Sequence, residues 1–170
     1  NQAYFDLLIK YGYKVDCSYT PGINWNTSLG RSKGSMGSDY SSVSESAQII
    51  KGSDNKGSLL EVPMTTRTRN VWISQPGRGL RGIASSVYHF LKGKQMWFRP
   101  MNDNLNDIKK LISLERESDY LMFMIHSSEL MPGGSPKFKT KESVEELYDV
   151  ITEIFEIVSK THEGCTLREY

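Results

Sequence analysis

The stretch Y-L-M-F-M-I-H, residues 120–126, decides the fold that we predict for this chain. Its first six residues form an uninterrupted apolar run, which is typical of a strand buried on both faces of a parallel sheet. His126 follows as the polar residue at the carboxyl end of the predicted strand. Folds with parallel strands bind their ligands at this end, so His126 is the first candidate for function.

Helical and strand patterns alternate on both sides of this run. Apolar residues recur at helical spacing over residues 4–11, 80–91, 105–112 and 144–158. Strand patterns occupy residues 13–17, 59–63 and 96–98, and residues 165–168 are a further candidate. This alternation predicts an α/β fold in which right-handed crossovers join parallel strands, either as an open doubly wound sheet or as a barrel.

Composition limits the class of protein. The 170 residues suit a single domain spanning 1–170, and the formal charge of +1 offers no basic surplus for nucleic acid. No apolar run reaches the length of about 18 residues that a membrane span needs. The first residues carry no signal-peptide pattern, so we expect no membrane insertion and a cytoplasmic location, or an undetermined location if a signal precedes Asn1. Cys17 and Cys165 are far apart and form no C-x-x-C motif.

Residues 20–58 are rich in Ser, Gly and Asn and are too long for a routine connection, which is typical of a loop that carries function. Trp25 and Tyr40 lie in this loop and could supply faces for sugar stacking, although such rings are more often anchors. A second glycine-rich stretch, residues 77–82, matches G-x-G-x-x-G. Because Pro76 separates it from the preceding apolar residues 71–73, we favour an ordinary loop over a dinucleotide site.

Three titratable side chains are candidates for a catalytic role, and each also has a structural alternative. His126 could act as general acid or base, and the alternative is a core histidine with satisfied hydrogen bonds. Glu61 and Glu129 could form the carboxylate pair of a glycosidase, whereas a salt bridge from Glu61 to Arg67 or Arg99 is the structural alternative. No set of His, Asp, Glu or Cys residues has the spacing of metal ligands.

Three segments together resemble the C-terminal portion of polysaccharide deacetylases, the carbohydrate esterase family with the NodB-homology fold. The segments are Tyr11–Trp25 (Y-G-Y-K-V-D-C-S-Y-T-P-G-I-N-W), Leu59–Thr66 (L-L-E-V-P-M-T-T) and Met122–Pro136 (M-F-M-I-H-S-S-E-L-M-P-G-G-S-P). The family's late L-x-H motif is present as Met124-Ile125-His126, with Met in place of Leu. Glu61 stands where the family has an Asp-Trp pattern.

The resemblance implies a distorted, parallel-stranded β/α barrel, of which this chain supplies a part, and a bacterial enzyme of glycan biosynthesis. It also implies a divalent metal, commonly zinc, in the complete enzyme, and it gives His126 the role of general acid toward the leaving amine. The family's Asp-Asp pair and H-x-x-x-H, which hold that metal, have no counterpart here. We expect them before Asn1, and we expect no metal to be held by this chain alone.

These inferences combine into one functional prediction and two alternatives. The prediction is hydrolysis of N-acetyl or O-acetyl groups on a polysaccharide or glycan precursor, with His126 as acid and with Glu61, Arg99, Glu129, Trp25 and Tyr40 binding the carbohydrate substrate. The first alternative is a barrel remnant that binds carbohydrate without catalysis. The second is a glycosidase that uses Glu61 and Glu129.

Overall fold

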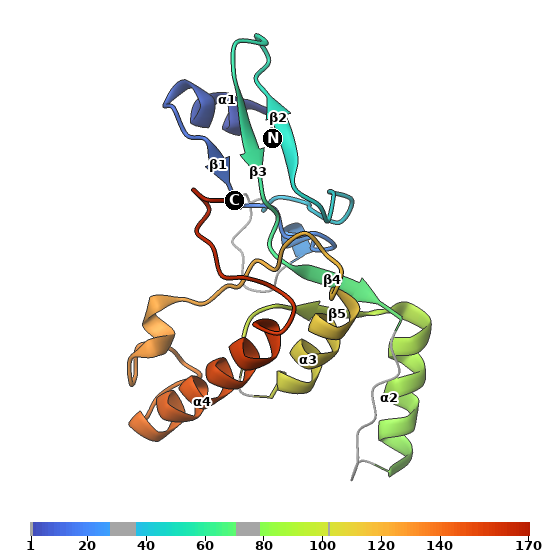
Figure 1. The fold of residues 1–170 in the computed structure, drawn as a ribbon. Helices are drawn as coiled ribbons and strands as arrows, with labels where there is room; N and C mark the ends of the chain where they lie inside the picture. Colours follow the sequence, from blue (N-terminus) through green and yellow to red (C-terminus); the bar gives the residue numbers. More distant parts are fainter. Residues whose placement is uncertain (1, 28–36, 71–78, 102) are drawn as a thin grey trace.

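The computed structural model describes residues 2–27, 37–70, 79–101 and 103–170 as a mixed α/β fold (Figure 1). Its elements in chain order are α1 (Gln2–Lys10), β1 (Val15–Asp16), the 3-10 helix η1 (Trp25–Thr27), β2 (Gln48–Lys51), β3 (Ser58–Glu61), β4 (Thr66–Arg69), α2 (Gly79–Lys92), β5 (Lys94–Trp97), α3 (Leu105–Leu114), the 3-10 helix η2 (Ser127–Leu130) and α4 (Lys141–Val158).

The first layer is a three-stranded sheet in the order β1-β3-β2, with α1 beside it (Figure 1). β1 and β3 are parallel and place Asp16 opposite Glu61, while β2 and β3 are antiparallel. The helix lies where the apolar spacing predicts it, but its buried residue is Phe5, whereas Tyr4, Leu7 and Tyr11 of the predicted apolar stripe are exposed. The parallel pairing of β1 and β3 therefore agrees with the sequence pattern, whereas β2 lies inside the residues that we predicted as loop.

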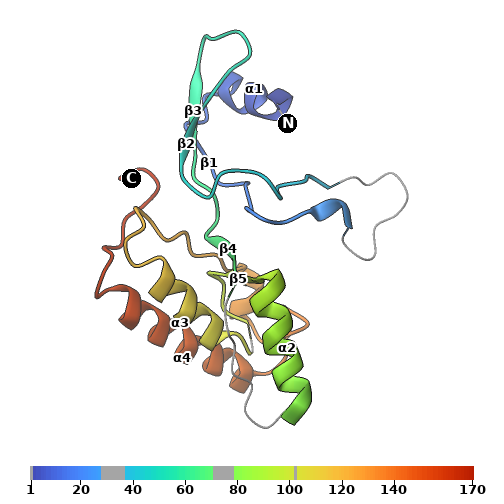
Figure 2. The ribbon, with the colours of Figure 1, turned by 90° about the vertical axis from the view of Figure 1, so that its right-hand side faces the viewer.

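Residues on either side of the gap at 28–36 extend from this sheet to one side (Figure 2). The two segments are joined by backbone hydrogen bonds, since Gly22 N–H donates to Tyr40 O at 3.0 Å and Tyr40 N–H donates to Ile23 O at 2.8 Å. We call residues 17–27 and 37–47 the extension. Its η1 end contacts the second layer, because the Trp25 and Trp97 rings meet edge to face at 6.0 Å.

The second layer contains the antiparallel pair β4–β5, together with α2, α3 and α4 (Figure 1). The four helices lie where the apolar spacing predicts them. The core of this layer is formed by buried side chains of β5, α3 and α4, namely Met96, Phe98, Ile108, Leu111, Ile112 and Ile154. Residues 71–73 and the start of the glycine-rich stretch lie outside the described residues.

Residues 120–125 differ from the strand that their apolar run predicts. They run extended beside β5, but Met124 N–H donates to Phe98 O at 3.2 Å, while Met122 N–H donates to the Thr65 side chain at 2.8 Å. These bonds do not make a regular ladder, and the segment is not a strand. Its apolar character has another cause, because Phe123 packs on the core of the second layer and Ile125 packs on a separate cluster around Leu147.

The predicted strand at residues 165–168 needs correction, and the predicted barrel stays a prediction. Residues 165–168 lie in an irregular segment that ends in a turn instead of a strand, and their side chains are exposed. Among the described residues the strands form a sheet of three and a sheet of two. Closure into a parallel-stranded β/α barrel remains a prediction.

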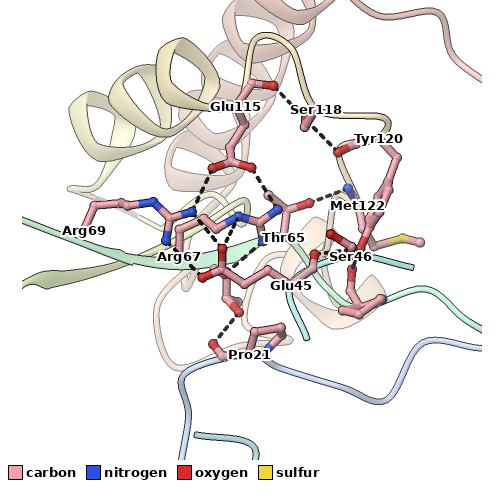
Figure 3. Close-up of polar contacts among 12 residues, drawn as sticks. Pro21, Glu45, Ser46, Thr65, Arg67, Arg69, Glu115, Ser118, Tyr120 and Met122 are labelled. Atoms are coloured by element: carbon pink, nitrogen blue, oxygen red, sulfur yellow. Dashed lines mark hydrogen bonds and ion pairs between the residues drawn. The ribbon is translucent and has the colours of Figure 1, made fainter. Parts of the chain in front are cut away.

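An ionic network joins the extension, β4 and the end of α3 (Figure 3). Arg67 is buried and its Nη2 lies 2.8 Å from Glu115 Oε2, while its Nε lies 3.3 Å from Glu45 Oε2. Arg69 binds the Glu45 carboxylate through two hydrogen bonds of 3.0 and 2.7 Å. Two guanidinium groups thus face two carboxylates, so that the buried charge is balanced.

Candidate functional site

His126 follows the extended segment 120–125 directly and precedes η2, and its side chain is exposed. The core-histidine alternative does not apply in this structure, because the residue lies on the surface. An exposed imidazole at the end of an extended segment can meet a ligand and exchange a proton with it.

The backbone of His126 is held in place by Glu129. The His126 N–H donates to Glu129 Oε2 at 3.1 Å, and the Glu129 N–H donates to the His126 carbonyl at 2.9 Å. The other carboxylate oxygen of Glu129 accepts a hydrogen bond from Arg99 Nη2 at 2.8 Å. Burial alone would raise the pKa of Glu129, but the hydrogen bonds from His126 N–H and Arg99 outweigh burial and lower it. Glu129 is therefore a buried anion that anchors the chain at His126.

Arg99 is held through both its backbone and its side chain. It follows β5, and its carbonyl accepts a hydrogen bond from the Asn104 amide at 2.8 Å, which lies just before α3. Its side chain is 21% exposed and reaches Glu129. The structure thus brings together His126, Glu129 and Arg99, three residues that the sequence analysis selected separately.

Glu61 belongs to a different cluster, at the ends of β1 and β3. Its side chain is fully buried, and its Oε1 accepts a hydrogen bond from Tyr19 N–H at 2.9 Å. Its neighbour across the parallel strands is Asp16, and the two carboxyl groups interact electrostatically. Burial and the contact with Asp16 raise the pKa of Glu61 to about 8. Glu61 is thus a neutral carboxylic acid below this pH.

Asp16 has the opposite character. Burial favours its neutral form, but hydrogen bonds from Glu61, Ser18 and Tyr4 lower its pKa below the usual value. The strand pattern predicted for residues 13–17 places Asp16 near a strand end, but the sequence does not pair Asp16 with Glu61. The signal for that pairing is the shared position of the two residues at the ends of adjacent parallel strands, which requires the strand order to be known.

The described contacts do not join Glu61 to Glu129. Glu61 contacts Asp16 and Tyr19, whereas Glu129 contacts Arg99 and His126. The salt bridge predicted as the alternative for Glu61 is also absent from the described ion pairs, since Arg67 binds Glu45 and Glu115 and Arg99 binds Glu129. The structure thus supports neither the glycosidase pair nor that salt bridge.

Trp25 and Tyr40 lie in the extension and are half-buried. The indole N–H of Trp25 donates to the Thr20 hydroxyl at 2.9 Å, and its ring packs against Trp97. Tyr40 packs against Tyr19 at 5.2 Å between ring centroids. Both rings therefore anchor the extension, as the structural alternative for loop aromatics predicts.

A cavity of about 720 Å³ lies between the segment 118–123 and the residues that follow α4. Aromatic side chains from several segments line it, including Phe98, Tyr120, Phe123, Phe155 and Tyr170. None of the six predicted site residues lines this cavity. It has the volume of a small-molecule site, but it is separate from the His126 cluster.

The described residues do not fit a resident metal. In residues 2–27, 37–70, 79–101 and 103–170, no three His, Cys, Asp or Glu side chains gather closely enough to hold an ion. The Glu129 carboxylate is already occupied by Arg99, and the Asp16 carboxylate by Tyr4 and Ser18. We therefore assign no chemical step of this chain to a metal.

Comparison with known proteins adds no relative: neither family models, nor curated proteins, nor solved structures gave a match. Within the part of the chain that the structure describes, no helix combines the length and the apolar character needed to cross a membrane.

Proposed function

We propose that this chain forms part of a carbohydrate deacetylase in which His126 is the general acid. The proposal follows the resemblance of three sequence segments to polysaccharide deacetylases. The observation that carries it is the exposed imidazole of His126 on a backbone that the buried Glu129 fixes. A catalytic acid needs both access to the substrate and a defined position.

The proposed role concerns the second half of amide hydrolysis. Water adds to the acetyl carbonyl and gives one proton to solvent, which forms an anionic tetrahedral intermediate. The bond from this carbon to nitrogen then breaks, and the nitrogen takes the proton of the His126 imidazolium, so that acetate and a free sugar amine leave. Without this proton the nitrogen would leave as an amide anion, which is a very poor leaving group.

Arg99 and Glu129 act in this proposal as positioning residues. The ion pair at Glu129 Oε1 fixes the carboxylate whose second oxygen, Oε2, accepts the His126 N–H. Glu61 has no substrate contact in this scheme, since its side chain is fully buried.

The test measures acetate release by the intact protein from N-acetylglucosamine oligosaccharides. We expect His126→Ala to lower kcat about 100-fold or more with a small change in KM, because general-acid catalysis contributes factors of about 10² to 10⁴. Ser127→Ala, which changes the exposed neighbouring residue, is the matched control and should retain the rate.

A comparison of leaving groups makes the test specific for the acid. An activated phenyl acetate expels its phenolate without a proton, so its hydrolysis should depend little on His126. Equal losses on both substrates, or no loss on the amide, would contradict the proposed role. Sugar binding without acetate release would support the non-catalytic alternative, and release of reducing ends would support the glycosidase.

A further inference from the structure

The ends of β1 and β3 place two carboxyl groups side by side in a buried position. The strands are parallel, and their register sets Asp16 opposite Glu61. Glu61 is fully buried, and Asp16 is partly buried. The proposed deacetylase chemistry uses neither residue, so the pair has no role in the site described above.

Asp16 has more hydrogen-bond donors around its carboxyl group than Glu61 has. Asp16 accepts hydrogen bonds from the Tyr4 hydroxyl at 3.0 Å, the Ser18 hydroxyl at 2.6 Å and the Ser18 N–H at 3.3 Å. Glu61 Oε1 accepts the Tyr19 N–H, but no donor of the described residues reaches Glu61 Oε2, which is buried. A buried carboxylate oxygen without a donor is costly, whereas a protonated oxygen could itself donate to Asp16.

We propose that Asp16 and Glu61 share a single proton, carried by Glu61, and that this proton is a pH-sensitive latch that holds the end of β1 and the extension against β3. The proton supplies a hydrogen bond between the two groups and removes the repulsion between two adjacent anions. When it leaves in mildly alkaline solution, two buried carboxylates face each other. The end of β1 then separates from β3.

The surroundings leave Glu61 as the group that titrates first. The titratable side chains around the pair are all acids: Tyr4 from α1, Asp16, Cys17 and Tyr19 from β1 and the residues after it, Tyr40 from the extension and Tyr120 from the segment beside β5. From β2, the residue opposite Glu61 is the neutral Gln48. Among the described residues, a group of opposite charge is reached only through Tyr120, on which Arg67 acts, and no cation contributes to the pKa of Glu61.

Cys17, Tyr19 and Tyr120 stay neutral where Glu61 loses its proton. Burial and the nearby carboxylates raise the pKa of the Cys17 thiol to about 11, and burial raises the pKa of Tyr19 and Tyr120 above the usual tyrosine value. Between about pH 7 and pH 9 the charge of this region therefore changes through Glu61.

The backbone bonds next to the pair report whether the latch is closed. Val62 N–H donates to the Asp16 carbonyl at 2.9 Å, and Met64 N–H donates to the Tyr19 carbonyl at 2.9 Å. Both bonds join the chain around β1 to the chain around β3. Opening should expose these two amides to solvent together, while amides in α4 remain protected.

The test follows the Glu61 carboxyl carbon of the intact protein by NMR from pH 3 to pH 10. We expect its inflection near pH 8 and that of Asp16 below the usual aspartate value. In parallel, hydrogen exchange at Val62 and Met64 should be at least about tenfold faster in the wild type than in Glu61→Gln at pH 9, and equal at pH 6. Glu61→Gln is a neutral mimic of the protonated acid, so comparison at one pH cancels the intrinsic pH dependence of exchange.

Each outcome decides the proposal. An inflection of Glu61 near its ordinary value of 4.5 would overturn the shared proton. Equal exchange in the wild type and Glu61→Gln at pH 9 would overturn the latch. If Glu61→Gln does not fold, Asp16→Asn replaces it: without the Asp16 charge the Glu61 inflection should move down, and an unchanged inflection would contradict the proposal. None of these measurements uses catalytic activity, so the latch can fail while the deacetylase proposal stands.

Discussion

Glu61 and Glu129 are both buried glutamates, yet their surroundings move the pKa in opposite directions. Glu129 has an arginine and a backbone N–H within hydrogen-bond distance, so its anionic form is stabilised. Glu61 has a single backbone donor and an aspartate neighbour, so its neutral form is stabilised. The residue type alone predicts neither state, because the partners come from distant parts of the chain.

The stability of the fold should depend on pH through Glu61 with an unusual sign. Its pKa in the folded state is about 8 and thus above the value of 4.5 for an unperturbed glutamate. The folded protein therefore binds more protons than the unfolded chain between these values, so stability is greatest below pH 4.5 with respect to this group and falls as pH rises to about 8. Glu129, whose pKa is lowered, contributes stability above its unfolded pKa and loses it in acid.

We predict that Glu129→Gln lowers the free energy of unfolding by about 1–3 kcal/mol at pH 7, since Arg99 loses its counter-ion. Arg99 is one-fifth exposed, which limits the loss. Urea denaturation measures the effect, and the exposed Glu145→Gln on α4 is the control. The difference between wild type and Glu129→Gln should shrink as the pH falls below the ordinary glutamate value of 4.5, and a constant difference would argue against the ion pair.

At the scale of single elements, two glycines end helices in the same conformation but in different surroundings. Gly12 after α1 and Gly93 after α2 both have φ of +81°. A Cβ at Gly12 would meet nothing within 4 Å, whereas one at Gly93 would lie 2.8 Å from the Thr68 side chain. The first glycine is needed for its backbone angle alone, and the second also permits the close approach of β4.

This pair gives a matched prediction. Gly12→Ala should cost about 1 kcal/mol of unfolding free energy, from the left-handed backbone alone. Gly93→Ala should cost about 2–3 kcal/mol, because steric contact with Thr68 adds to the same strain. Urea unfolding of both variants measures the two values, and equal losses would show that β4 shifts to relieve this contact.

Sequence periodicity worked better for helices than for strands, and the reason is physical. A helix satisfies its backbone hydrogen bonds locally, so the apolar spacing of residues 144–158 predicts α4 well. A strand depends on a partner. Residues 120–125 have the composition of a buried strand but lack a regular ladder, and Thr66–Arg69 forms β4 with little apolar character because β5 lies beside it.

At the scale of the whole molecule, the network of Arg67, Arg69, Glu45 and Glu115 connects regions far apart in the sequence (Figure 3). Glu115 ends α3 and is nearly buried, while Glu45 lies in the extension with a side chain 39% exposed. The two carboxylates should thus contribute differently to the free energy of unfolding, because exposed ion pairs are screened by water and salt.

We predict that Glu115→Gln costs about 3 kcal/mol of unfolding free energy, since it leaves the buried Arg67 guanidinium without this carboxylate. Glu45→Gln should cost about 1 kcal/mol, and added salt should reduce this loss but not the loss for Glu115→Gln. Denaturation of each variant and of the double variant, at low and high salt, measures the costs. Losses that simply add would contradict a shared network.

The sequence alone determined the positions of the helices and the choice of His126, Glu61, Arg99 and Glu129 as polar candidates, because these properties depend on local spacing and residue type. The tertiary structure decided which candidates meet. It joined His126, Glu129 and Arg99 in one cluster and set Glu61 against Asp16 in another. The difference arises because hydrogen bonds and charge interactions act through space, while a sequence pattern records only distance along the chain.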